Sequence, residues 1–330
     1  MKMVKFTFNS KIQGKLIWFF GKGDEIALYT SRYSAGRSDM TRYNNVRIFL
    51  ERALSMHNLT STVHYYGSRV SGTSVGRSDI DFFVEIGDNF CTPNSQEDAA
   101  KVLRKIKNAI DKSNDFKVTI FLPKATVPLL RVVYLRTDFE CDVVASSGLS
   151  VRLCHIINHL NSLQPQIIPL FHYIRIWIHL CGINMKRYVQ FLLIFFYLQQ
   201  NSYMPTIQNI QKGLSKEFIG DWEVQFNRTR TLNSYGLKKM VRYANHIVGY
   251  FRFYSKINFE EFVLSIYEGK CIKRSEYNKY DSYKINKPLC IAGPLDLGFN
   301  SGQTVSKAAM QKFPGMCQSS IDFLVQRGWN

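Results

Sequence analysis

Close cysteine pairs, long apolar runs and acidic residues are all scarce in this chain of 330 residues. Its seven cysteines show no C-x-x-C pair and no partner histidines at the spacing of a zinc site. This argues against a zinc module and against a secreted disulfide scaffold. The longest apolar run, Phe191–Leu198, is far shorter than the roughly 20 residues that a membrane-spanning helix needs. We therefore expect no membrane partner.

Acidic residues are outnumbered by basic ones, 25 against 43, which gives a formal net charge of +18. Hydrophobic residues make up 45% of the chain, so it is not a disordered polycation. A positive balance in a folded chain indicates a polyanionic partner, such as a nucleic acid, a nucleotide or an anionic membrane surface. No Asp or Glu occurs between Asp142 and Glu217. Either buried helices exclude acids there, or the stretch lines a pocket for an anion, and composition leaves both interpretations open.

The first residues of the chain are basic. Residues 1–23 contain five lysines and no acid. Mitochondrial transit peptides share the lack of acids but favour Arg and Ser over Lys. We therefore predict a basic extension over residues 1–40 and a cytoplasmic protein, with mitochondrial and nuclear locations as alternatives.

Hydrophobic spacing predicts an α+β domain over residues 41–150, followed by a mainly helical domain over 151–330. In the first part, helices are predicted at 44–56 and 96–111, and strands at 62–66, 79–86, 116–122, 127–135 and 139–144. Helices mixed with consecutive strands are typical of an α+β fold. In the second part, we predict helices near 151–162, 166–181, 186–200, 236–255 and 258–268.

The most informative residues are a Gly-Ser pair and three aspartates. Gly67-Ser68 follows a predicted strand, and Asp79 and Asp81 follow ten residues later. Alternate residues of a strand face the same side, so these two carboxylates project together. Their repulsion is costly unless a cation bridges them. Asp142, in a later strand, is a third candidate ligand, and a glycine-containing turn offers backbone N–H groups to a phosphate.

This order of strand, Gly-Ser, D-x-D and later strand aspartate resembles the nucleotidyltransferase superfamily of DNA polymerase β. Further segments resemble its branch of template-independent poly(A) and poly(U) polymerases, which includes the terminal uridylyltransferases. The resemblance covers roughly residues 44–310. The matching segments are Val127–Leu130 for the R-V-P-I strand, Pro169–Trp177 for the V-K-x-W helix, Tyr188–Gln199 for S-S-Y-G…Y-L-Q, Asn258–Gly269 for F-D…V-x-S-I-x-x-G, and Pro288–Asp296 with Asn300 for the P-L-x-I-E-D-P-F tail element.

The resemblance implies a polymerase-β-like catalytic domain with a mixed sheet, a helical poly(A)-polymerase-associated domain and a cleft between them. It also implies that helix 44–56 packs on the second domain. Two Mg²⁺ or Mn²⁺ ions are expected at the aspartates, with Asp142 binding the ion that activates the RNA hydroxyl. The residues expected to bind the nucleotide are Gly67, Ser68, Arg175, His179, Lys186, Arg187, Tyr188 and Asp296.

The activity implied is transfer of a nucleoside monophosphate from a nucleoside triphosphate to the 3′-hydroxyl of RNA, without a template and with release of pyrophosphate. Tyr188 and Asp296 favour UTP, with ATP as the alternative. Several pocket residues depart from the family pattern: Thr126 replaces an arginine, Val151-Arg152 replaces N-[ST], and Ala292-Gly293 replaces E-D. Partner proteins are expected to supply RNA specificity.

Two other interpretations remain open at this point. A non-catalytic RNA-binding protein of the same fold would fit the departures in the pocket. A related transferase that acts on a small molecule would share the aspartates but not the Y-L-Q and tail elements.

Overall fold

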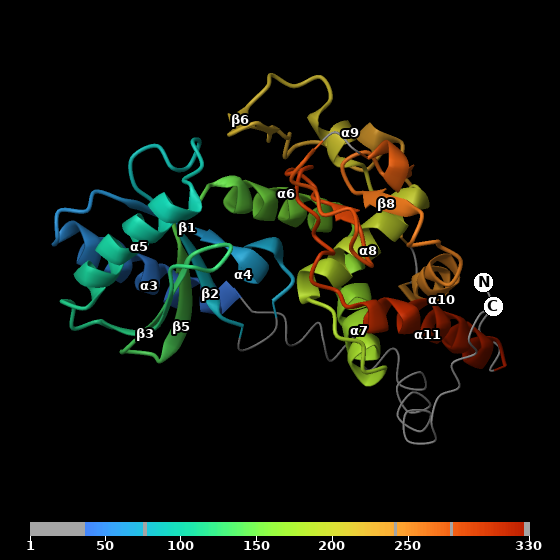
Figure 1. Cartoon of the computed structure of the whole chain (residues 1–330), viewed down its shortest axis with the longest axis horizontal. Helices are drawn as coiled ribbons and strands as arrows, with labels where there is room; N and C mark the ends of the chain where they lie inside the picture. Colours follow the sequence, from blue (N-terminus) through green and yellow to red (C-terminus); the bar gives the residue numbers. More distant parts are fainter. Residues whose placement is uncertain (1–36, 75–77, 241–242, 278–279, 327–330) are drawn as a thin grey trace. The chain divides into compact units, whose positions relative to one another are not determined.

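The computed structural model describes residues 37–74, 78–240, 243–277 and 280–326. These residues form two compact units (Figure 1). The first comprises the described residues up to His159 together with Leu214–Phe226, and the second comprises Leu160–Gly213 and the residues from Asn227 onward. The division falls inside helix α6 (Leu149–Leu163), after His159, nine residues beyond the boundary predicted at residue 150. The basic extension predicted over 1–40 lies outside the described residues except for its last four.

The first unit is built on a mixed five-stranded sheet with the order β1-β2-β5-β4-β3. The neighbours β2 and β5 run parallel, and the other three pairs are antiparallel. The α+β class and the mixed sheet are therefore confirmed. The elements of this unit are α3 (Arg37–Ser55), β1 (Thr62–Tyr66), α4 (Gly67–Ser71), β2 (Ile80–Glu85), α5 (Gln96–Ile110), β3 (Phe116–Leu122), β4 (Leu129–Tyr134), β5 (Phe139–Val144), most of α6, β6 (Phe218–Ile219) and β7 (Trp222–Glu223).

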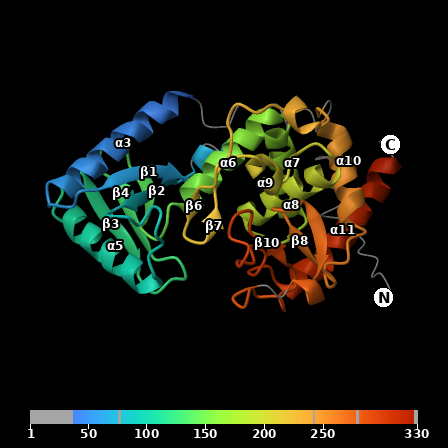
Figure 2. The same ribbon diagram turned by 90° about the horizontal axis from the view of Figure 1, so that it is seen from above.

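Helices α3 and α5 cover one face of this sheet, as the view from above shows (Figure 2). Val46, Leu50 and Leu54 of α3 are buried in the same core as Phe82 of β2 and Val132 of β4. The apolar face of α3 therefore packs within the first unit, whereas we expected this helix to pack on the second domain. Because alternate strand residues face opposite ways, the other face of the sheet carries Asp81 and Asp142 beside a smaller apolar cluster that contains Phe83 and Val144.

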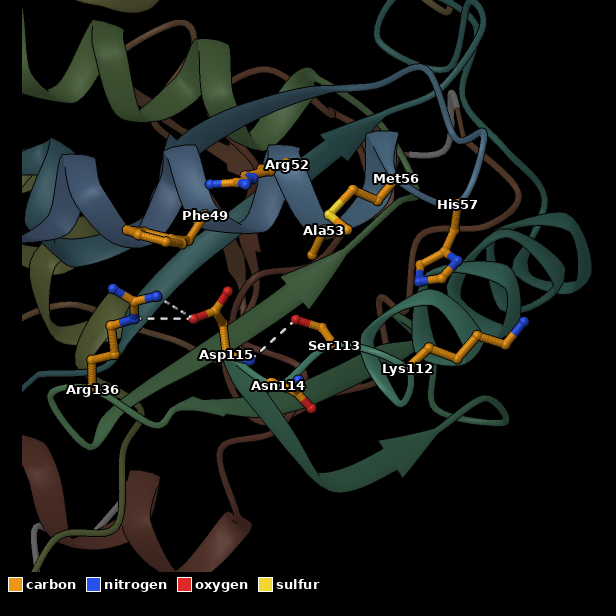
Figure 3. Close-up of a pocket in the computed structure, with 10 residues that line it drawn as sticks. All are labelled: Phe49, Arg52, Ala53, Met56, His57, Lys112, Ser113, Asn114, Asp115 and Arg136. Atoms are coloured by element: carbon orange, nitrogen blue, oxygen red, sulfur yellow. Dashed lines mark hydrogen bonds and ion pairs between the residues drawn. The ribbon is translucent and has the colours of Figure 1, made fainter.

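A cavity of about 250 Å³ lies where β3 begins and β4 ends, against the C-terminal part of α3 (Figure 3). Arg136 turns toward Asp115 there, with Nε 3.0 Å and Nη2 2.9 Å from Oδ1. The lining residues are Phe49, Arg52, Ala53, Met56, His57, Lys112, Ser113, Asn114, Asp115 and Arg136. None of the predicted site residues lines this cavity.

The second unit is mainly helical. Its elements are the end of α6, α7 (Ile167–Leu180), α8 (Arg187–Gln200), α9 (Ile207–Gln211), η1 (Asn233–Tyr235), α10 (Tyr243–Tyr254), β8 (Phe262–Ser265), β9 (Lys270–Lys273), η2 (Arg274–Glu276), β10 (Ile291–Ala292) and α11 (Lys307–Val325). Trp177 of α7 joins two helices, because its ring lies 4.6 Å from that of Phe251 in α10 and its Nε1 donates to Ser320 Oγ of α11 at 2.9 Å. Among the described residues, no helix combines the length and apolar character needed to cross a membrane.

Three predictions for this unit need correction. The helix predicted over 258–268 is wrong, since Phe262–Ser265 forms strand β8 between β9 and β10. A short buried apolar run fits a helix and a strand equally well, and the positive φ of Gly269 turns the chain into a hairpin. The helix predicted from residue 236 begins only at Tyr243 in the described residues. Helix α11 was missed, because Pro314 and Gly315 interrupt its pattern.

The side chain of Asn300 organises the tail of this unit. It is 2% exposed, and its Nδ2 donates to the carbonyls of Lys284 at 3.0 Å and Leu289 at 3.1 Å. Its Oδ1 accepts from the backbone N–H groups of Ile291 at 3.1 Å and Gly302 at 2.8 Å. One amide thus satisfies four backbone groups, two of them beside strand β10.

Replacing Asn300 by Ala should lower the free energy of unfolding of this unit by about 2–4 kcal/mol, because four backbone groups lose a hydrogen-bond partner. Urea unfolding followed by circular dichroism measures the change. Asn286→Ala, at an exposed position of the same segment, is the matched control and should leave stability within about 0.5 kcal/mol. Equal stability of the two variants would contradict this role of Asn300.

Candidate functional site

The Gly-Ser turn lies directly beneath one of the aspartates. Strand β1 ends at Tyr66, and Gly67 opens the short helix α4 with a φ of +77°. A Cβ placed on Gly67 would lie 1.9 Å from Asp81 Oδ2. Both this close contact and the positive φ therefore favour glycine at this position. The backbone N–H of Ser68 donates to the Asp81 carboxylate. The backbone N–H of Gly67 donates to Cys154 Sγ at 3.1 Å.

A row of polar side chains crosses the sheet on the face opposite helices α3 and α5. Tyr66 pairs with Asp81 across β1 and β2, and Asp81 pairs with Asp142 across β2 and β5. Asp142 pairs in turn with Arg131 across β5 and β4. Residues in register on neighbouring strands point to the same face. The sheet therefore holds Asp81, Asp142 and Arg131 side by side, and Asp79 lies just before β2.

Arg131 binds two of the three aspartates. Its Nε lies 2.6 Å from Asp142 Oδ1, and its Nη2 lies 2.8 Å from Asp142 Oδ2, which is a two-pronged contact. The same Nη2 reaches Asp79 Oδ2 at 3.3 Å, and Nη1 lies 3.8 Å from Glu140 Oε2. The Asp142 side chain is only 15% exposed. We expected metal ions to neutralise these carboxylates; in this structure an arginine pairs with Asp142 and Asp79.

Asp81 is the carboxylate that Arg131 does not contact directly. Burial, followed by the charges of Asp142 and Asp79, raises the pKa of Asp81 from 3.8 to about 7. The guanidinium of Arg69 and the N–H of Ser68 act in the opposite direction. A cation placed nearby would lower this raised pKa, because it stabilises the charged form of the Asp81 carboxyl group.

Arg69 holds the backbone just before β2. Its Nε donates to the carbonyl of Asp79 at 3.2 Å, and its Nη2 donates to the carbonyl of Ser78. The guanidinium lies over the ring of Tyr43, 4.1 Å from the centroid, and also contacts the Tyr43 hydroxyl. Arg69 thereby sets the entry of the chain into β2, where Asp79 and Asp81 are located.

The donor set of this site fits a divalent cation. Carboxylate oxygens are the ligands that Mg²⁺ and Mn²⁺ prefer, and three carboxylates gather on one face around a guanidinium that stands where a cation is needed. In the described part of the chain, no three His, Cys, Asp or Glu side chains are already arranged as a metal site. Arg131 contacts two of the three carboxylates, those of Asp142 and Asp79.

The other predicted nucleotide-binding residues lie in the second unit. Arg175 and His179 are on α7, Lys186 precedes α8, and Arg187 and Tyr188 open α8. Arg175 is half-buried, and burial together with the charge of Arg187 lowers its pKa. The first turn of α8 contains no acid, and its N-cap residue makes no side-chain hydrogen bond. These cations therefore lie near the N-terminal end of a helix whose first turn carries no acid, which favours an anion.

Asp296 has a structural role in this unit. Its carboxylate accepts hydrogen bonds from the backbone N–H groups of Gly298 and Phe299, so it closes the turn after β10. Burial nevertheless raises its pKa above the ordinary value. The structure thus brings Gly67, Ser68 and the three aspartates together in the first unit. The remaining six predicted residues all lie in the second.

Three residues of the site were missed by the sequence analysis. Arg131, Arg69 and Cys154 all touch the aspartates or the turn that supports them. Only Arg131 could have been noticed from the sequence, because it is the single charged residue within the predicted strand 127–135. The contacts of Arg69 and Cys154 depend on the path of a loop and on helix packing.

The raised pKa of Asp81 predicts a pH dependence of stability in the metal-free protein. Between pH of about 4 and about 7 the folded state holds a proton that the unfolded chain releases, so stability should fall as the pH rises through this window. Asp81→Asn should remove most of this decline. Thermal unfolding of the first unit at pH 5 and pH 8 measures it, with Asp138→Asn, an exposed carboxylate, as control. An unchanged pH dependence in Asp81→Asn would contradict the raised pKa.

Comparison with known proteins matches both units to described families. Residues 24–162 match the model "Poly(A) RNA polymerase, mitochondrial-like, central palm domain", and residues 242–298 match "Cid1 family poly A polymerase". Together the two matches span more than half of the chain. Human terminal uridylyltransferase 7 is 22% identical over 257 residues, which cover 73% of this chain and 17% of that protein.

The mitochondrial poly(A) RNA polymerase of Drosophila melanogaster is 22% identical over 196 residues, covering 56% of this chain and 31% of that protein. The chain spans between 17% and 41% of the length of the curated relatives that it matches. The crystal structure of mtPAP in complex with UTP superposes with a TM-score of 0.78 at 19% identity, over 92% of this chain and 68% of that one. The same protein has been solved with ATPγS, at a TM-score of 0.78 and 18% identity over the same shares of both chains.

The fold, the motif order and both family models agree. The chain is therefore a relative of the terminal uridylyltransferases and poly(A) polymerases, similar to them over residues 24–162 and 242–298 by family model and over 92% of its length by fold.

Proposed function

We propose that this chain transfers nucleoside monophosphates from a nucleoside triphosphate to the 3′-hydroxyl of RNA, without a template. One bond forms between the RNA 3′-oxygen and the α-phosphorus, and the bond from that phosphorus to the pyrophosphate oxygen breaks. The hydroxyl proton is lost to solvent, and pyrophosphate leaves. The observation that carries the proposal is that Asp81 and Asp142 lie in register on neighbouring strands, with Asp79 just before β2 and a glycine turn packed against Asp81.

Two Mg²⁺ or Mn²⁺ ions are the cofactors that Asp79, Asp81 and Asp142 would hold. Such ions, when bound, make the hydroxyl a better nucleophile and stabilise the charge on the leaving pyrophosphate. The chain itself orients the ligands: the N–H of Ser68 holds the Asp81 carboxylate, and Arg69 fixes the backbone at Asp79. Gly67 leaves room for Asp81 Oδ2 beside the turn where the phosphates would bind.

The second unit would bind the triphosphate. Arg175, Lys186 and Arg187 supply positive charge beside the start of α8, where the positive end of the helix dipole also suits phosphate oxygens. His179 is exposed on α7, one turn after Arg175, and is the weakest of these contacts because a histidine is only partly charged near neutral pH.

UMP is the favoured donor group, with AMP as the alternative. Tyr188 is 38% exposed at the start of α8, where its ring can stack on a base. Asp296 is the acid expected to read uracil, although two backbone N–H groups already occupy its carboxylate. The related mtPAP binds UTP in one crystal structure and ATPγS in another, which supports keeping both donors.

RNA is the proposed acceptor, and the net charge of +18 would attract its phosphates. Protein partners would supply specificity for a particular RNA. We keep a cytoplasmic location as the proposal, with nuclear and mitochondrial locations as alternatives, and a relative named as a mitochondrial polymerase supports the latter.

The first test compares all four nucleoside triphosphates on one labelled RNA primer with Mg²⁺ or Mn²⁺. We expect extension, fastest with UTP, and a loss of at least about a hundredfold in kcat for Asp142→Asn, because the ligand supplies several kcal/mol of transition-state stabilisation. Extension by neither protein with any nucleotide would instead favour a non-catalytic RNA-binding protein. Small-molecule products formed without RNA would point to a different acceptor.

The second test addresses the cations of α8. Arg187→Ala should raise the KM for the nucleotide about tenfold with a smaller change in kcat, since a charge-assisted hydrogen bond contributes about 1.5–3 kcal/mol. Arg104→Ala, which removes an exposed arginine from α5 of the first unit, is the matched control and should leave KM unchanged. An unchanged KM in Arg187→Ala would remove this residue from the proposed site.

A further inference from the structure

We propose that Arg131 is an internal counter-cation, which occupies Asp142 and Asp79 in the metal-free protein and moves to Glu140 when a divalent cation binds. The inference rests on the proposed function, because it concerns the aspartates that would hold the metal. It assigns Arg131 a role in metal binding, and it gives this arginine a second partner, Glu140, besides the aspartates.

The first argument is geometric. The planar guanidinium takes both oxygens of Asp142, at 2.6 and 2.8 Å, and one oxygen of Asp79 at 3.3 Å. These are oxygens that a metal ion would need. A guanidinium and a divalent cation cannot share them closely, because like charges at such short range repel strongly where solvent is limited. Binding of the metal therefore requires the guanidinium to retreat.

The second argument concerns where the guanidinium can go. Glu140 lies two residues before Asp142 on β5, so both side chains project from the same face of the sheet. Its carboxylate is already 3.8 Å from Nη1 of Arg131, and it is 54% exposed, compared with 15% for Asp142. A small movement of the long arginine side chain toward solvent would exchange Asp142 for Glu140 without moving a strand.

The third argument concerns the need for the pair. Asp142 is held between Asp81 and Arg131 in the register of the sheet, and its side chain is mostly shielded from water. A shielded carboxylate without a partner is costly, so the sheet would be destabilised whenever the metal is absent. Arg69 cannot take this role, because its guanidinium is engaged by the carbonyls of Ser78 and Asp79 and by Tyr43.

The two partners of Arg131 give opposite predictions for metal affinity. Arg131→Met removes the competing cation and should tighten Mn²⁺ binding about tenfold, while lowering the melting temperature in the absence of metal. Glu140→Gln removes the partner that receives the guanidinium and should weaken Mn²⁺ binding about two- to threefold. Arg131→Lys keeps the charge but cannot bind both oxygens of Asp142 with a planar guanidinium. Its Mn²⁺ affinity should therefore fall between those of wild type and Arg131→Met.

Isothermal titration of the full chain with Mn²⁺ alone, together with melting curves with and without Mn²⁺, measures these effects. Arg136→Met is the matched control, because Arg136 also pairs with an aspartate, Asp115, just beyond the end of β4. It should leave Mn²⁺ affinity unchanged. Should Arg131→Met fail to fold, Arg131→Lys and Glu140→Gln still predict shifts in opposite directions.

Equal or weaker Mn²⁺ binding by Arg131→Met, or tighter binding by Glu140→Gln, would overturn the inference. The proposed function would survive such a result if the wild-type protein binds Mn²⁺ and Asp81→Asn does not. Absence of Mn²⁺ binding in both the wild-type protein and Arg131→Met would overturn the inference and the proposed metal site together.

Discussion

The repulsion among three carboxylates on one face of a sheet is the constraint on which the rest of this site depends. Asp81 and Asp142 are in register on parallel neighbours, and Asp79 reaches the same guanidinium as Asp142. The N–H of Ser68 and the arginine opposite Asp142 offset that repulsion, and a glycine leaves space for the Asp81 side chain. Together they hold the three carboxylates close to one another on the same face of the sheet.

The chemistry of the two units is complementary. The first unit concentrates acids around a glycine turn, and the second concentrates Arg175, Lys186 and Arg187 around the start of α8. The stretch without Asp or Glu between residues 142 and 217 runs largely through α6, α7 and α8. It contains buried helix faces, which fit the exclusion of acids from buried helices, and the cations of α8, which the proposed anion site would use.

The sequence was sufficient where local pattern and chemistry coincide. Alternation placed β1, β3 and β5 at their observed bounds, and the D-x-D spacing placed Asp79 and Asp81 on one side. It was insufficient where tertiary contacts decide. Strand β8 exists because β9 and β10 flank it, and helix α11 tolerates Pro314 because it packs on α10 and α7. Arg131 could be noticed but not interpreted, since its role depends on which strand lies beside β4.

The central claim is that the aspartate row exists to bind divalent cations and that Arg131 stands in for them. Anomalous diffraction from crystals soaked in Mn²⁺ tests it most directly, because it locates the ion and the arginine in one map. The account predicts a manganese peak in contact with Asp79, Asp81 and Asp142, with the guanidinium of Arg131 moved from Asp142 toward Glu140. A map with no manganese at the triad and with Arg131 still bound to both oxygens of Asp142 would contradict it.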